Sequence, residues 1–116
     1  MLYMILIKGS EHSEKTFQPE GDLMEAMDEF NDQLEASNVK FMAKGLHPTS
    51  EGYRIQFDQF HQPTSMIKGP FEPFKDQLAG FFLIEVTSEE EALNWFKQVP
   101  DPIGYGSGLI ELRKVY

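Results

Sequence analysis

The chain is organised around residues Met66–Ser88, which read Met-Ile-Lys-Gly-Pro-Phe-Glu-Pro-Phe-Lys-Asp-Gln-Leu-Ala-Gly-Phe-Phe-Leu-Ile-Glu-Val-Thr-Ser. The order of these residues predicts the end of a strand, a tight turn at Gly69-Pro70 and a short irregular or helical turn. Gly80 then opens a strongly apolar strand, and helix signals follow Thr87. Strands and helices in this arrangement are typical of an α+β domain.

Two predicted strands are apolar on both faces. Side chains of a strand alternate between the two faces of its sheet, so apolar residues at both odd and even positions predict cover on both sides. Residues Phe81–Val86 form one such strand, and Tyr3–Lys8 form the other.

Residues Gly21–Ser37 predict an amphipathic helix, because four apolar residues recur at spacings of four, three and four. These residues are Leu23, Met27, Phe30 and Leu34. The other side of the helix is acidic, with Glu25, Asp28, Glu29, Asp32 and Glu35. We interpret these carboxylates as a solvated face, although paired carboxylates can also serve as metal ligands or acid–base partners. Asn38 is placed to end the helix in a left-handed conformation.

A second helix is predicted after Ser88, because this serine and Glu91 three residues later form a capping box. Its apolar stripe consists of Ala92, Trp95, Phe96 and Val99. Pro100 is expected to end this helix, since proline removes a backbone donor and clashes with the preceding turn.

The remaining segments complete the fold. Residues Tyr53–Phe57 alternate between apolar and polar side chains and predict a half-exposed antiparallel strand. A turn at Gln59–Pro63 leads into its partner strand, Thr64–Lys68. Val39–Leu46 and Leu109–Val115 also have strand character. The order of strand, helix, strand, hairpin, strand, helix and strand predicts an α+β fold, a ferredoxin-like plait with an inserted β-hairpin.

Length and composition exclude several classes of protein. The 116 residues, 41% of them hydrophobic, fit a single domain over residues 1–116. A net charge of −9 provides no basic surface for nucleic acid or for an anionic membrane. No apolar run approaches the roughly 20 residues that span a bilayer. The absence of cysteine excludes disulfides and thiolate chemistry, and it fits the reducing cytoplasm, where we expect the protein.

The two helices can cover only one face of the predicted sheet, because the crossover helices of such a plait lie on the same side. The strands that are apolar on both faces would therefore expose large side chains, each of which forgoes roughly 1.5–3 kcal/mol of burial. A second copy packed sheet against sheet would cover them. We expect a homodimer, with a small-molecule pocket near its interface.

Short motifs spread over the whole chain are Tyr3-Met4-Ile5-Leu6-Ile7, Gly45-Leu46-His47-Pro48, Gly69-Pro70-Phe71, Ile84-Glu85-Val86 and Glu111-Leu112-Arg113. In this order and spacing they resemble the DGPF-domain proteins of the YCII-related superfamily. The resemblance implies a ferredoxin-like dimer that forms a dimeric α+β barrel. Some members look like small-molecule enzymes that use a His/Asp pair, and others are encoded with extracytoplasmic-function sigma factors, which suggests regulation.

The chain departs from that family at its namesake motif. Lys68 stands where the family has aspartate, so the motif reads Lys-Gly-Pro-Phe. Any acid–base role of that aspartate in relatives is closed to this chain at that position. An ammonium group in place of a carboxylate also inverts the local field and favours an anionic ligand.

The sequence assigns no catalytic residue, and His47 is the candidate. Its neutral imidazole could act as a general base oriented by Glu111, or it could be a turn residue bonded to nearby backbone. The residues that we select for ligand binding are Lys68, Phe71, Lys75, Glu111 and Arg113. Arg113 offers a planar fork for a carboxylate or phosphate, but it could equally form an ion pair on the sheet. The two lysines could simply be solvated.

We expect neither a cofactor nor a metal. The histidines His12, His47 and His61 have no metal-ligand spacing. The glycine-rich segment Gly104–Gly108 leads into a strand, whereas a phosphate-binding loop opens a helix.

Two functions remain open, and so does the question of whether the protein is an enzyme. The first is a small-molecule-binding dimeric α+β barrel with lyase- or isomerase-type activity on a small anionic substrate. The second is a non-catalytic interaction or regulatory module whose acidic helix face binds a protein partner such as a sigma factor.

Overall fold

The computed structural model describes residues 1–11, 13–14, 21–102, 106 and 108–116. The strands and helices along the chain are β1 (Leu2–Lys8), α1 (Gly21–Ala36), β2 (Lys40–Gly45), β3 (Tyr53–Phe57), β4 (Pro63–Lys68), β5 (Leu78–Glu85), α2 (Glu89–Phe96) and β6 (Ile110–Lys114). Two short 3₁₀ turns, η1 (Thr49–Glu51) and η2 (Phe74–Asp76), connect β2 to β3 and β4 to β5.

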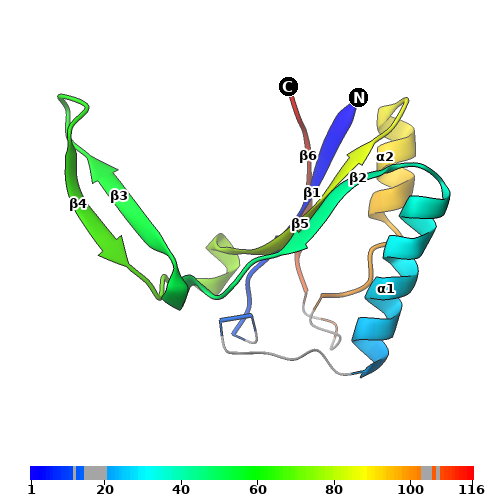
Figure 1. Cartoon of the computed structure of the whole chain (residues 1–116), viewed down its shortest axis with the longest axis horizontal. Coiled ribbons are helices and arrows are strands. Elements are labelled where there is room, and N and C mark those ends of the chain that lie inside the picture. Colours follow the sequence, from blue (N-terminus) through cyan, green and yellow to red (C-terminus); the bar gives the residue numbers. More distant parts are fainter. Residues whose placement is uncertain (12, 15–20, 103–105, 107) are drawn as a thin grey trace.

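Four strands form one antiparallel sheet in the order β2-β5-β1-β6, and both helices cover the same face of it (Figure 1). The fold is therefore α+β, and its strand order is compatible with a ferredoxin-like plait. β3 and β4 form a separate two-stranded antiparallel hairpin between β2 and β5. No helix in the described part of the chain is long and apolar enough to cross a membrane.

The core lies between the sheet and the helices. Alternate residues of the central strands are buried there, including Ile5 of β1 and Ile84 of β5, both fully inaccessible. Phe30 of α1 packs edge-on against Phe82 at 5.2 Å between ring centroids, and Leu34 lies one turn further along the helix. The apolar stripe predicted on the helix thus packs against the alternate strand residues that face it. An amphipathic helix and a sheet form a core in this way.

The opposite face of the sheet is apolar and only partly covered. It carries Met4 and Leu6 of β1 beside Leu83 and Phe81 of β5, all half-buried, and the register places Met42 of β2 next to Leu83. We call this surface, with these five residues, the open face. The prediction that the helices cover one face only is confirmed. The structure also identifies which alternate residues of the central strands the helices leave uncovered.

The β3–β4 hairpin, which we call the arm, projects from the sheet on its open side (Figure 1). Every residue of both strands is exposed. The prediction that Tyr53–Phe57 is half-exposed is therefore wrong for the single chain. An alternating pattern identifies a strand with one apolar face, but that face is buried only where another element lies against it.

Two turns connect the arm to the sheet, and the backbone packing of one of them leaves room only for glycine at residue 69. The Gly69 N–H donates to the Gly52 carbonyl at 3.0 Å, which joins the two turns. A Cβ atom at residue 69 would lie 1.8 Å from the Thr49 carbonyl oxygen, so no larger residue fits without moving the backbone. The predicted short turn after Pro70 is η2, and Asn38 has the predicted left-handed conformation, with φ of 57°.

Helix α2 begins as predicted and ends earlier than predicted. The Ser88 hydroxyl accepts from the Glu91 N–H at 3.1 Å, as an N-cap does. The Glu91 carboxylate accepts from the N–H and hydroxyl of Thr87, at 2.8 and 2.7 Å. The helix ends at Phe96, not at Pro100, because the N–H groups of Gln98 and Val99 bond three residues back and tighten the last turn. Val99 still packs against the core from outside the helix.

Candidate functional site

A pocket of about 510 Å³ lies where the arm joins the sheet. Its walls come from the two connections between sheet and arm, residues 46–54 on one side and residues 71–78 on the other. The polar side chains in its lining are His47, Thr49, Glu51, Arg54, Asp76 and Gln77. Both connections are held in place by short turns, so these side chains project from ordered backbone.

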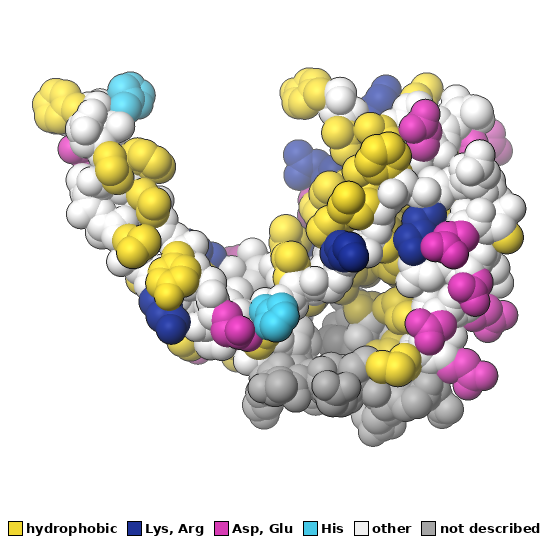
Figure 2. Space-filling view, in the orientation of Figure 1, with side chains coloured by type: hydrophobic (Ala, Val, Ile, Leu, Met, Phe, Trp, Pro, Cys, Tyr) yellow, Lys and Arg dark blue, Asp and Glu magenta, His cyan; other side chains and the backbone are white. Residues whose placement is uncertain are grey.

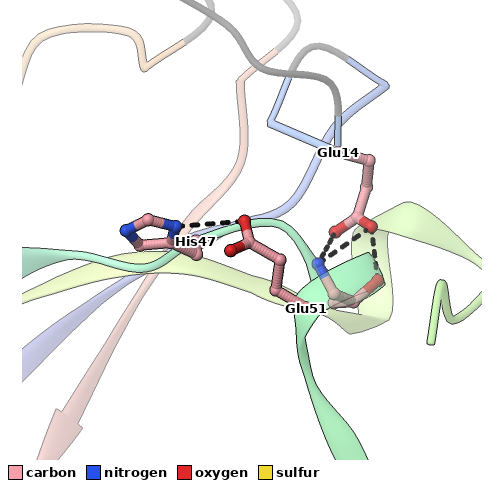
Figure 3. Close-up of polar contacts among 4 residues, drawn as sticks. Glu14, His47 and Glu51 are labelled. Carbon is pink, nitrogen blue, oxygen red and sulfur yellow. Dashed lines mark hydrogen bonds and ion pairs between the residues drawn. The ribbon is translucent and has the colours of Figure 1, made fainter. Parts of the chain in front are cut away.

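His47 and Glu51 form a close pair at this pocket (Figure 3). Pro48 precedes the 3₁₀ turn η1, which folds the chain back so that Nδ1 of His47 lies 3.0 Å from Oε2 of Glu51. A hydrogen bond from Nδ1 to the Glu51 carboxylate requires the tautomer with its proton on Nδ1, and that tautomer keeps the lone pair on Nε2. This arrangement suits a histidine that accepts a proton at Nε2 while the carboxylate stabilises the resulting cation.

Glu14 fastens the N-terminal segment to the same turn (Figure 3). Its carboxylate accepts from the Thr49 N–H at 3.2 Å and also from the Thr49 hydroxyl. The Thr49 hydroxyl oxygen in turn accepts from the Phe71 N–H at 2.9 Å. Thr49 therefore ties together three segments that are distant in sequence, and it fixes the turn that carries Glu51.

Arg54 of β3 lies across the pocket wall. Its Nη2 donates to Oε1 of Gln77 at 2.7 Å, and its guanidinium stacks over the Phe71 ring at 3.9 Å from the centroid. Gln77 is only 6% exposed and donates through Nε2 to the Pro73 carbonyl. Arg54 has no carboxylate partner among the described residues, so most of its N–H groups remain available to a ligand.

The structure divides the ligand-binding residues selected from the sequence into two groups. Phe71 lines the pocket together with His47. Lys68 ends β4 near the pocket, with Nζ 5.8 Å from the Tyr53 ring centroid, and Lys75 is exposed on η2. Neither lysine lines the pocket.

Glu111 and Arg113 lie elsewhere, on β6 at the opposite edge of the sheet, about 14 Å from β2 across three strand spacings. They pair with each other at 3.3 Å. The interpretation of Glu111 as the group that orients His47 does not hold within one chain, because Glu51 occupies that place. The alternative interpretation, an ion pair on the sheet, describes what the structure shows.

Sequence reasoning missed Glu51, Arg54, Gln77 and Glu14. A signal existed for Glu51, because it follows His47 by four residues across a Pro-Thr-Ser segment that favours a turn. The other three residues act through contacts between distant segments, and no local pattern marks them.

The remaining sequence candidates add nothing to this site. His61 is an exposed residue of the arm's turn, with φ of 63°. His12 and residues 104, 105 and 107 of the glycine-rich segment lie outside the described residues. Within the described residues there is no group of three or more His, Cys, Asp or Glu side chains that could hold a metal ion.

Comparison with known proteins identifies the family. No curated protein matches the chain. The family model described as the YCII-related domain matches residues 1–116, and the chain therefore belongs to the YCII-related family.

Proposed function

We propose that the protein is a homodimer that binds a small anionic molecule in the pocket at the base of the arm and transfers a proton to or from it. The observation that supports this proposal is the His47–Glu51 pair, at 3.0 Å, in the same pocket as Arg54. A proton-transfer group and a cationic hydrogen-bond donor in one pocket suit lyase- or isomerase-type chemistry next to a carboxylate.

Each group has a distinct part in this chemistry. The Arg54 guanidinium, held flat by Phe71 and Gln77, offers paired N–H donors to a carboxylate or phosphate of the ligand. Nε2 of His47 takes a proton from the carbon or hydroxyl beside that anion, and Glu51 stabilises the charged ring. A volume of about 510 Å³ is in the usual range for small-molecule sites.

A single chain leaves this pocket too open for efficient proton transfer. The side chains of His47 and Glu51 are 83% and 60% exposed, and water screens charges that are so exposed. The dimer in our proposal supplies the missing cover, because sheet-to-sheet packing would bury the apolar open face and narrow the hollow next to the pocket (Figure 2).

The test combines binding with proton exchange. Small carboxylates and phosphates are screened by calorimetry, and the best binder is followed by NMR for exchange of its acidic C–H protons with deuterated solvent. We expect His47→Gln to lose exchange while keeping most of the binding. Arg54→Lys should weaken binding, because it keeps the charge and loses the planar fork. The matched control is His61→Asn, which changes an exposed histidine of the arm's turn and should alter neither measurement.

The result that rejects this proposal is equally specific. If no small anion binds the wild-type protein, or if His47→Gln exchanges ligand protons as fast as the wild type, the pocket has no such role.

A second candidate function, a protein-binding module without turnover, is favoured by the surface of α1. All five acidic side chains predicted to lie on its outer side are exposed, and they gather on the flank of the molecule away from the arm (Figure 2). Under this alternative, Asp28→Lys with Asp32→Lys abolishes co-purification with a basic protein partner such as a sigma factor. Under the pocket proposal, the same double variant keeps ligand binding unchanged.

A further inference from the structure

We propose that the arm is a dimerisation element whose apolar side is buried against a second copy of this chain, in an interface continuous with the open face. This inference rests on the dimer in the proposed function and goes beyond it, because sheet-to-sheet packing alone assigns the arm no part.

The arm has one apolar side and one polar side. The register of β3 and β4 pairs Ile55 with Met66 and Gln56 with Ser65. Paired residues project from the same face of a hairpin, and successive pairs alternate between faces. Tyr53 and Phe57 therefore share a face with Ile55 and Met66, and we call these four residues the apolar side. Lys68, which pairs with Tyr53, lies on the same face at the base of the arm. The other face carries Arg54, Gln56, Ser65 and Ile67.

The apolar side is a large exposed apolar patch for a chain of this size. Its four side chains are 52–69% exposed. Since an aromatic side chain buries about 150–250 Å² when fully covered, the four together offer roughly 400 Å². A contiguous patch of that size matches the largest apolar patch of a typical monomer, which is often a functional surface. Hairpins with nothing against them are also marginally stable in water, so cover would stabilise the arm itself.

The second apolar surface of the same chain faces the same space. Figure 2 shows hydrophobic side chains along the arm and over the sheet, on the two sides of a hollow. The arm does not lie against its own sheet, and every residue of its strands is exposed. The Gly69–Gly52 hydrogen bond and the Arg54–Gln77 contact lie at its base. Two apolar surfaces that one chain cannot join can be joined reciprocally by two copies about a two-fold axis.

The area also fits a second copy. Two arms contribute roughly 800 Å², and the surfaces that they cover contribute a similar amount. The sum of roughly 1,600 Å² is that of a standard stable interface. The chain's charge is compatible with the same partner, because a net charge of −9 disfavours contact between acidic surfaces of two copies, and this face carries no acidic residue and one cationic one, Lys68.

The test compares two neighbouring residues on opposite faces of β4. Met66→Asp places a carboxylate on the apolar side, whereas Ser65→Asp places the same charge on the polar side, so the net charge changes equally. In sedimentation velocity over a concentration series, we expect Met66→Asp to raise the dimer dissociation constant by about 100-fold or more. In a symmetric dimer, the substituted residue lies in the interface once in each copy. We expect Ser65→Asp to stay close to the wild type.

A labelling experiment checks the contact directly. The chain has no cysteine, so Met66→Cys and Ser65→Cys each introduce a single thiol. Met66→Cys should react slowly with a thiol reagent at concentrations where the protein is dimeric and quickly on dilution. Ser65→Cys should react quickly at both. Circular dichroism confirms that each variant is folded, which we expect because the arm contributes nothing to the buried core.

The outcomes separate this inference from the proposed function. A dimer that Met66→Asp leaves as stable as the wild type, with Met66→Cys freely reactive, overturns the arm's role and leaves the sheet-to-sheet dimer standing. A wild-type chain that stays monomeric at all concentrations overturns both. Ligand binding in the pocket is measured independently of either result.

Discussion

The four-stranded sheet and the arm are built from similar sequence and have opposite surroundings. β1 and β3 are both short strands rich in large apolar side chains, yet alternate residues of β1 are buried beneath two helices and every residue of β3 is exposed. The difference lies in the element that comes after each strand along the chain. β1 leads to α1, which folds back over it, while β3 leads through a tight turn into β4 alone. An alternation of apolar and polar side chains therefore marks a strand face that can be buried. Whether that face is buried depends on whether another element packs against it.

The sharpest way to test this comparison is to truncate one isoleucine in each region. Ile84 is fully inaccessible in the core, and Ile84→Ala should lower the free energy of unfolding by about 3 kcal/mol, through lost burial and the cavity left behind. Ile55 on the arm is 52% exposed, and Ile55→Ala should cost less than about 0.5 kcal/mol within one chain. Urea denaturation at several protein concentrations separates this cost from any effect on association. Equal losses for the two variants would contradict the division into core and arm.

The junction between the two regions is the next most sensitive place. Gly69→Ala would force a methyl group against the Thr49 carbonyl oxygen, so we expect a loss of roughly 1–3 kcal/mol of stability. The matched control is Gly45→Ala at the end of β2, where an added Cβ meets nothing within 4 Å. Thermal unfolding measures both variants. A Gly69→Ala protein as stable as Gly45→Ala would show that the turn is not packed as described.

The N-cap of α2 tests a local contribution on the covered side of the sheet. Ser88→Ala removes the acceptor for the Glu91 N–H, and such a loss costs about 1 kcal/mol. Thr64→Ala on the arm also removes one side-chain hydrogen bond to backbone, from its hydroxyl to the Gln56 carbonyl, and should cost less because the site is exposed. Urea midpoints for the two variants provide the comparison. A larger loss at Thr64 would reverse the expected order.

The smallest expected effect is a pH dependence that arises from Glu91. The Thr87 N–H, and then the Thr87 hydroxyl, donate to its carboxylate and hold the pKa of Glu91 below its ordinary value of 4.5. Because the pKa is lower in the folded state, this stabilisation is present above pH 4.5 and is lost as the pH falls through the lowered pKa. Melting temperatures of Glu91→Gln between about pH 6 and 3 should fall less steeply than those of the wild type. Parallel melting curves for the two proteins would show that Glu91 does not contribute to the loss of stability in acid.

The sequence was a good guide to elements and a poor guide to the site. The stripe containing Phe30 and Leu34, the N-cap at Ser88 and the left-handed Asn38 were all predicted, because each depends on residues a few positions apart. The end of α2 was missed, since hydrogen bonds three residues back tighten the turn before Pro100. His47 was selected from its motif, but the partner it has in the structure, Glu51, was not foreseen, and the Glu111 suggested for that place lies on the far edge strand.

What the sequence determined by itself is the set of helices and strands, their order and the apolar side of each, because hydrophobic periodicity and capping act between near neighbours. Only the tertiary structure decided which parity of the central strands faces the helices, that the arm stands apart from the sheet, and that Glu51, Arg54 and Gln77 meet in one pocket. These outcomes depend on strand register and on contacts between distant segments, such as Glu14 with Thr49 and Arg54 with Gln77. The free energy of such contacts arises only when the chain has folded, so no local pattern in the sequence records them.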